Sequence, residues 1–261
     1  MKLCSLFKAD STPRHIQTQP TMSTSASANL PSASIAAPYD REYLNDRLAE
    51  AACYAVLRRL MPVLRHDVAG SMQPVRMLMM VLERRVHAPE PDVQAITKNV
   101  VSVSALTKQA TADCINALEW VGSSQDAYVS LRSSVDEAIK LLAIELSAHA
   151  LVLVNGISDD TATAPQSFLR TVFMGSLLAF CDQCAAGGTL KVTFEAATGS
   201  QRPHQLQLRL LPGGADKPPA FQGLVRKYRL MDWHDVAAMA GTFGVTVTQG
   251  DDWLTLDLPK V

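Results

Sequence analysis

Leu64–Met72, with the sequence LRHDVAGSM, decides the fold class because it places a histidine–aspartate pair inside a long helical pattern. From about residue 40 to residue 86, apolar residues recur mainly every three or four positions, which predicts an amphipathic helix. His66 lies two residues from the apolar stripe on either side, at Leu64 and Val68, so we expect the imidazole to face water. Small residues follow one turn later, and this pattern suits an imidazole that must meet a bulky partner.

A second helix is expected from about residue 93 to residue 121, after a turn over His87–Pro91. Pro62 and Pro74 are expected to bend the first helix. Two long helices joined by a short turn predict an antiparallel hairpin. A single hairpin covers too little of its apolar surface, so we expect two chains to form a dimeric four-helix bundle. The second helix has a heptad seam of Val93, Ile96, Val100, Val103, Thr107, Ala110, Cys114, Ala117 and Val121.

Beyond a predicted linker at Gly122–Asp126, the chain alternates between helical and strand patterns, which is typical of an α+β domain. The first helix of this part is expected to be capped by Ser133 or Ser134, and residues 158–165 are expected to form a turn. The expected helices are 135–148, 168–184 and 232–240, and the expected strands are 150–157, 190–196, 205–211, 244–248 and 253–258.

The composition of the 261 residues excludes several classes of protein. Hydrophobic residues make up 48% of the chain, so it can bury a sizeable core. The net charge is −1, and without an excess of basic residues the composition does not indicate binding to nucleic acid or to an anionic membrane. No transmembrane span or signal peptide is expected. Residues 1–38 are rich in Ser, Thr, Ala and Pro and have no apolar period, which predicts a disordered tail. The five cysteines fit reduced thiols in a cytoplasm, and Cys181 and Cys184 are interpreted as buried small side chains.

From about Asp40 to Pro259, the histidine–acid hairpin and the order of elements after it resemble the core of a sensor histidine kinase. The resemblance implies a dimerisation and phosphotransfer hairpin over residues 39–122 and a two-layer α/β sandwich, like the kinase ATP-binding domain, over residues 127–261. His66–Met72 is similar to the family's H-box, His-Glu-Leu-Arg-Thr-Pro-Leu, which implies that His66 accepts phosphate. The Arg, Thr and Pro of that box are missing, and Gly70 stands where phosphatase activity requires Thr or Asn.

The second half departs further from the kinase pattern. The helix expected at Leu169–Asp182 lacks the asparagines that hold magnesium and phosphate in the family, and Gly175 and Ala179 stand in their places. Pro212–Asp216 lacks the acid that precedes the glycines of the adenine-binding box, and a second glycine-rich box is absent. We therefore expect that ATP chemistry is lost and that the chain has no cofactor of its own.

A kinase-like hairpin with a degenerate ATP-binding-like domain also resembles the histidine phosphotransferases of bacterial phosphorelays. That resemblance implies a cytoplasmic homodimer that passes phosphate between response regulators, with receiver domains and a hybrid histidine kinase as partners and magnesium supplied by the regulator. Asp67 would orient the imidazole. The expected partner-binding residues are Arg59, Arg65, Ala69, Gly70 and Gln73.

The sequence leaves other readings open. A non-catalytic regulatory module could dock on a kinase or regulator through the same helix, and a histidine kinase with a divergent nucleotide site is a third alternative. Gly70 could serve only to ease a bend near Pro74, and the arginines could form only a solvated face.

Overall fold

The computed structural model describes residues 40–122, 127–183, 187–197, 204–213 and 229–259. They belong to one compact unit, Tyr39–Val261. The expected tail, the linker after Gly122, most of the 212–229 loop and Cys184 lie outside the described residues.

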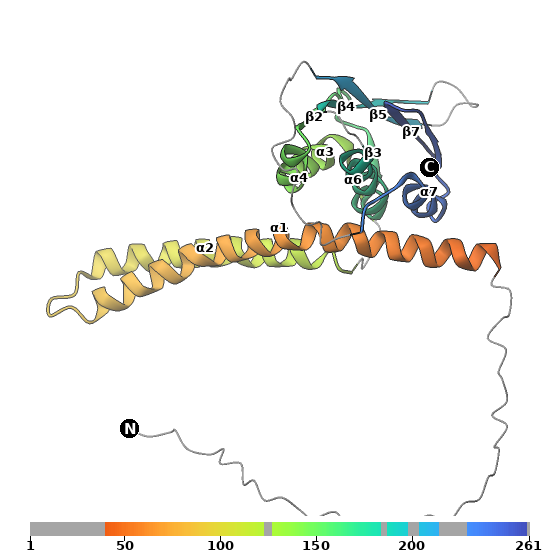
Figure 1. The fold of residues 1–261 in the computed structure, drawn as a ribbon. Coiled ribbons are helices and arrows are strands. Elements are labelled where there is room, and N and C mark those ends of the chain that lie inside the picture. The colour runs from red at the N-terminus through yellow and green to blue at the C-terminus, as the bar shows by residue number, and fades with distance from the viewer. Residues whose placement is uncertain (1–39, 123–126, 184–186, 198–203, 214–228, 260–261) are drawn as a thin grey trace, which may run out of the picture. The chain divides into compact units, whose positions relative to one another are not determined.

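The hairpin consists of α1, Arg41–Val86, and α2, Val93–Leu118, which lie side by side (Figure 1). Asp92 begins α2, because its carboxylate accepts a hydrogen bond from the backbone N–H of Ala95 at 3.0 Å. α1 remains one continuous helix through Pro62 and Pro74, so neither proline ends it. The predicted antiparallel hairpin is confirmed.

A five-stranded sheet forms one layer of the second half, in the order β2–β4–β5–β7–β6. β2 pairs with β4 in parallel and the other neighbours are antiparallel. Helices cover one face of the sheet (Figure 1), so the predicted α+β, two-layer arrangement is confirmed. The strands are Leu151–Asn155 (β2), Gly188–Glu195 (β4), His204–Pro212 (β5), Thr246–Gln249 (β6) and Trp253–Leu258 (β7), and the main helices are Leu131–Leu141 (α3), Ala143–Ala148 (α4), Met174–Gln183 (α6) and Trp233–Gly241 (α7).

Alternation along the strands explains why helices cover this face. In β7, Leu254, Leu256 and Leu258 are buried, while the residues between them are partly exposed. Successive strand side chains point to opposite faces, so these leucines all face the helices.

The first part of α1 packs against the outer side of the helix layer. Ala52, Val56, Leu60 and Leu64 are at most 7% exposed and belong to the same hydrophobic core as α6 and α7. The hairpin and the sandwich therefore share one core. Among the described residues, no helix combines the length and the apolar character that crossing a membrane requires.

A small sheet lies where a turn and an unassigned segment were expected. β1, Tyr128–Ser130, pairs antiparallel with β3, Thr163–Pro165. Ser130 then caps α3, because its hydroxyl accepts a hydrogen bond from the backbone N–H of Ser133. The predicted cap at Ser133 or Ser134 is wrong, since β1 ends at Ser130 and the helix begins directly after it.

The central helix also begins earlier than expected. It opens with α5, Gln166–Phe168, and continues through a π-helical stretch, η1, Leu169–Phe173, before α6. Single π-helical turns inside α-helices are rare and frequently lie at functional sites. Here the stretch carries Arg170, whose contacts are described below.

Candidate functional site: an exposed histidine on the hairpin

His66 projects from α1 into solvent, as its helical phase predicted. Its side chain is 85% exposed and that of Asp67 is 61% exposed. The imidazole Nδ1 lies 3.4 Å from Oδ1 of Asp67, at the outer limit for a hydrogen bond. Because a carboxylate only accepts, this contact favours the tautomer with the proton on Nδ1 and leaves the lone pair of Nε2 toward solvent.

The surface around His66 is open. Arg65, Ala69, Gly70 and Gln73 are exposed, as expected. A Cβ atom built on Gly70 would meet nothing within 4 Å. Gly70 is therefore not required for close packing within one chain, and its lack of a side chain leaves room beside the imidazole.

Arg59 corrects one of the expected partner-binding residues. Its side chain is only 5% exposed and points into the junction between α1 and the sandwich. Nη2 lies 2.9 Å from Oε2 of Glu145 on α4, and Nη1 donates to Oδ2 of Asp182 on α6. A buried guanidinium with these partners cannot meet another protein, so the prediction for Arg59 was wrong.

The reason lies in the helix phase of the first part of α1. Spacing by three and four residues puts Met61 on the predicted apolar stripe, yet this residue is 43% exposed. Small residues such as Ala52 allow α1 to approach the helix layer closely, and Arg59 lies on that same face. The available signal was the position of Arg59, three residues after Val56 and directly before Leu60 in a helical pattern.

Asp182 joins three segments. Its carboxylate accepts from Arg59 and from the backbone N–H of Met231, just before α7, at 2.7 Å. Burial lowers the pKa of the Arg59 guanidinium, but the bonds and charges of Asp182 and Glu145 outweigh it, so the pKa is raised. Arg59 therefore remains charged and holds the junction together.

A second arginine ties α2 to the sandwich. Arg170 donates to the backbone carbonyl of Glu119 at 2.8 Å and to its carboxylate at 3.2 Å. Its guanidinium also lies over the ring of Trp120, 5.0 Å from the centroid. Sequence reasoning missed this contact, because no local pattern pairs residues fifty positions apart.

The two positions expected to have lost magnesium ligands are packed with apolar atoms. Gly175 and Ala179 are buried on α6. A Cβ on Gly175 would lie 2.4 Å from Cε of Met239 on α7 and 3.5 Å from Cγ2 of Val56 on α1. Neither residue offers a side-chain oxygen, which magnesium requires. Within the described residues, no group of three or more His, Cys, Asp or Glu side chains could hold a metal ion.

No family model matches this chain, and no curated protein matches it. Among solved structures, it is similar to the Acinetobacter baumannii histidine kinase AdeS, with 13% identity over 71% of this chain and 96% of that chain and a TM-score of 0.38. The cytoplasmic segment of histidine kinase QseC has 10% identity over 59% and 95% of the two chains, with a TM-score of 0.37.

A further solved structure, described as a bacterial phosphotransferase, has 13% identity over 77% of this chain and 94% of that chain, with a TM-score of 0.33. Similarity at this level assigns no chemistry. The arguments about function below therefore rest on this chain's own residues.

Proposed function

We propose that this chain is a histidine phosphotransferase of two-component signalling, and that His66 carries the phosphoryl group. The observation that carries the proposal is the 85% exposed imidazole of His66, with the carboxylate of Asp67 on its Nδ1 side. Such an imidazole presents a nucleophilic Nε2 to a partner. The partner would be the receiver domain of a response regulator, in a cytoplasm, and a hybrid histidine kinase could supply one such domain.

The transfer step needs little from this chain. Nε2 of neutral His66 attacks the phosphorus of an aspartyl phosphate on the regulator, the N–P bond forms, and the P–O bond to the aspartate breaks. The aspartate leaves as a carboxylate, and the proton on Nδ1 stays beside Asp67. A second regulator's aspartate attacks in the reverse step. Positioning and charge stabilisation dominate such transfers, and the regulator would supply the magnesium.

Packing inside the sandwich supports a phosphate source other than ATP. The family's asparagine positions are held by Gly175 and Ala179, and the space beside Gly175 is filled by Met239. The chain would therefore need neither ATP nor a cofactor. Arg65, Ala69, Gly70 and Gln73, which are exposed around His66, would form the docking surface for the regulator.

One experiment tests the proposal. A phosphorylated response regulator and radiolabelled ATP are each mixed with the full chain, with His66→Ala and with His234→Ala. His234 is a matched control, because it is 93% exposed and its Nδ1 lies 3.8 Å from Asp232, but it lies on α7. We expect label to pass from the regulator to the wild type and to His234→Ala, and at least a hundredfold less to His66→Ala.

Label arriving from ATP would contradict the proposed loss of ATP chemistry. Stable binding of the regulator without any transfer of label would contradict the phosphotransferase proposal and favour the non-catalytic regulatory module. Equal labelling of the wild type and both variants would show that His66 is not the phosphate acceptor.

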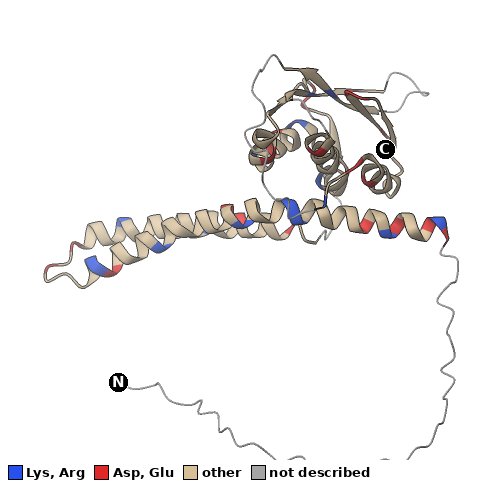
Figure 2. Ribbon diagram, viewed as in Figure 1, with Lys and Arg blue, Asp and Glu red and all other residues tan. Residues whose placement is uncertain are grey.

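A homodimer is part of the same proposal. In the α2 seam, Ala110 is buried and four residues are half-buried, while Val93 and Val100 are 72% and 49% exposed. On α1, Met72, Met79 and Val86 are spaced by seven residues and are 46–49% exposed. Figure 2 shows long stretches of the hairpin without charged residues. Exposed apolar side chains in heptad spacing on both helices fit a second copy of the hairpin in a four-helix bundle.

Light scattering after gel filtration is expected to give twice the chain mass for the wild type. Met79→Glu combined with Val100→Glu is expected to give the monomer mass with unchanged helix content by circular dichroism, because both side chains are exposed in one chain. A monomeric wild type would contradict the four-helix bundle.

A further inference from the structure

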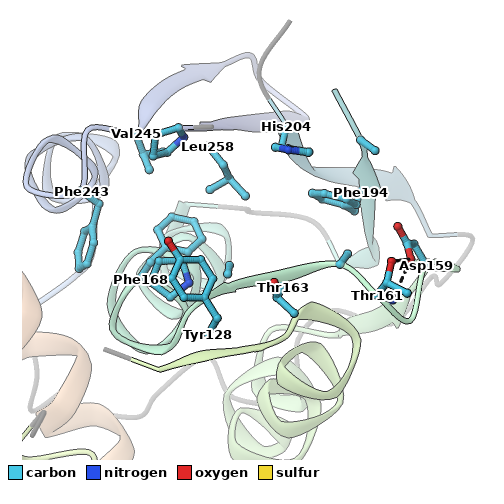
Figure 3. Close-up of a pocket in the computed structure, with 15 residues that line it drawn as sticks. Tyr128, Asp159, Thr161, Thr163, Phe168, Phe194, His204, Phe243, Val245 and Leu258 are labelled. Atoms are coloured by element: carbon cyan, nitrogen blue, oxygen red, sulfur yellow. Dashed lines mark hydrogen bonds between the residues drawn. The ribbon is translucent and has the colours of Figure 1, made fainter. Parts of the chain in front are cut away.

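A cavity of about 320 Å³ lies at one end of the sandwich, and α1 and α2 contribute nothing to its lining. Its walls come from β1 and β3, from α5, and from the ends of β4, β5 and β7 (Figure 3). The cavity is therefore separate from His66 and from Gly175, and the proposed phosphotransfer makes no use of it.

Aromatic rings form two walls of this cavity (Figure 3). On one side, Phe168 meets Phe243 edge to face, with ring centroids 6.1 Å apart. On the other side, Phe194 stacks on His204 at 5.8 Å with an interplanar angle of 12°. Tyr128 is half-exposed and also lines the cavity. The stacked pair gives a flat wall and the edge-to-face pair gives a second apolar wall, and both are already formed without a ligand.

Among the lining residues that the structure describes, the formal charge of Lys, Arg, Asp and Glu side chains has one sign. Asp159 is the only carboxylate among the described lining residues, and they include no Lys or Arg. Nδ1 of His204 accepts a hydrogen bond from the backbone N–H of Ala197 at 3.2 Å. The described lining therefore offers an anion no cationic Lys or Arg side chain.

Hydrogen bonds hold the Asp159 carboxylate in place. Its Oδ1 accepts from the hydroxyl of Thr161 at 2.6 Å and from the backbone N–H of the same residue at 2.8 Å. These hydrogen bonds lower the pKa of Asp159, so the carboxylate stays ionised at neutral pH. The neighbouring Asp160 is instead paired with Arg132 at 2.7 Å and does not line the cavity.

We propose that this cavity binds a small, flat organic cation of the protonated aromatic amine class. The ring of the ligand would pack between the Phe168–Phe243 pair and the Phe194–His204 pair. Its ammonium group would be attracted by the aromatic faces and by the carboxylate of Asp159. The cavity volume, near the lower end for ligand sites, fits a single fused ring system.

Three probes that share one ring system test the charge preference: tryptamine, 3-ethylindole and indole-3-acetate, which are a cation, a neutral molecule and an anion at pH 7. Each is titrated into the full wild-type chain, and dissociation constants are taken from chemical-shift changes of the protein. We expect tryptamine to bind at least tenfold more tightly than indole-3-acetate, with 3-ethylindole between them. No binding by any probe, or a preference for the anion, would overturn the proposal.

Asp159→Asn is expected to weaken tryptamine binding about fivefold or more and to leave 3-ethylindole binding unchanged. Asp160→Asn is the matched control and is expected to change neither constant. Both side chains are exposed, and thermal unfolding of each variant verifies that it folds. Unchanged tryptamine binding by Asp159→Asn would overturn the role of the carboxylate, and an equal loss in both variants would assign the effect to general surface charge.

Discussion

Arg59→Ala is expected to lower the free energy of unfolding by about 3–5 kcal/mol, because removing one partner of a buried ion pair leaves the other charge unpaired. Asp182, whose side chain is 1% exposed, would lose the guanidinium and keep the hydrogen bond from the N–H of Met231. The aliphatic part of Arg59 would also leave a gap between α1 and the sandwich. The measurement is urea unfolding of the full chain at neutral pH, followed by circular dichroism.

Arg65→Ala is the matched control, since Arg65 lies on the same helix and is exposed. Its effect is expected to stay within about 0.5 kcal/mol. Combining Arg59→Met with Asp182→Leu should recover much of the loss, because a buried ion pair replaced by apolar side chains often costs little. A loss below about 1 kcal/mol for Arg59→Ala would contradict the idea that this ion pair holds α1 on the sandwich.

Gly175→Asn is expected to lower the free energy of unfolding by about 2–5 kcal/mol and to create no affinity for ATP. The added side chain must displace Cε of Met239, which lies 2.4 Å from the position of a Cβ, and overpacking of a core costs about 1–3 kcal/mol. The amide would also be buried against Val56 and Met239, and a buried polar group without partners costs about 1–3 kcal/mol. Urea unfolding and calorimetric titration with magnesium and ATP measure the two effects.

Two variants separate crowding from polarity. Gly175→Ala is expected to cost less than Gly175→Asn, because the end of Met239 is flexible and can move. Gly70→Asn places the same residue in α1 where nothing lies within 4 Å, and it is expected to change stability by only a few tenths of a kcal/mol. Equal losses at Gly70 and Gly175 would show that helix propensity, and not packing against α7, explains the effect.

Repeating patterns made much of the fold predictable. The long helical period of α1 and the two prolines after His87 predicted the hairpin, and alternation along β4, β5 and β7 predicted strands close to their observed bounds. The exposure of His66 followed from the same reasoning, because its distance from the apolar stripe is a local property of a helix.

No repeating sequence pattern predicted the short sheet formed by β1 and β3. Each of its strands has three residues, too few for a repeating pattern, and they pair across more than thirty residues of chain. The cavity walled by Phe168 and Phe194 could not be expected either, since those residues lie in separate elements that only the fold brings together.

By itself, the sequence determined the helices, most of the strands and the solvent-facing position of His66, because each depends on neighbours within a few turns of chain. Only the tertiary structure decided that Arg59 forms a buried ion pair with Asp182. It also decided that Met239 fills the space beside Gly175. The physical reason is that a periodic pattern shows which face of an element is apolar, whereas the partner that covers this face comes from a distant part of the chain.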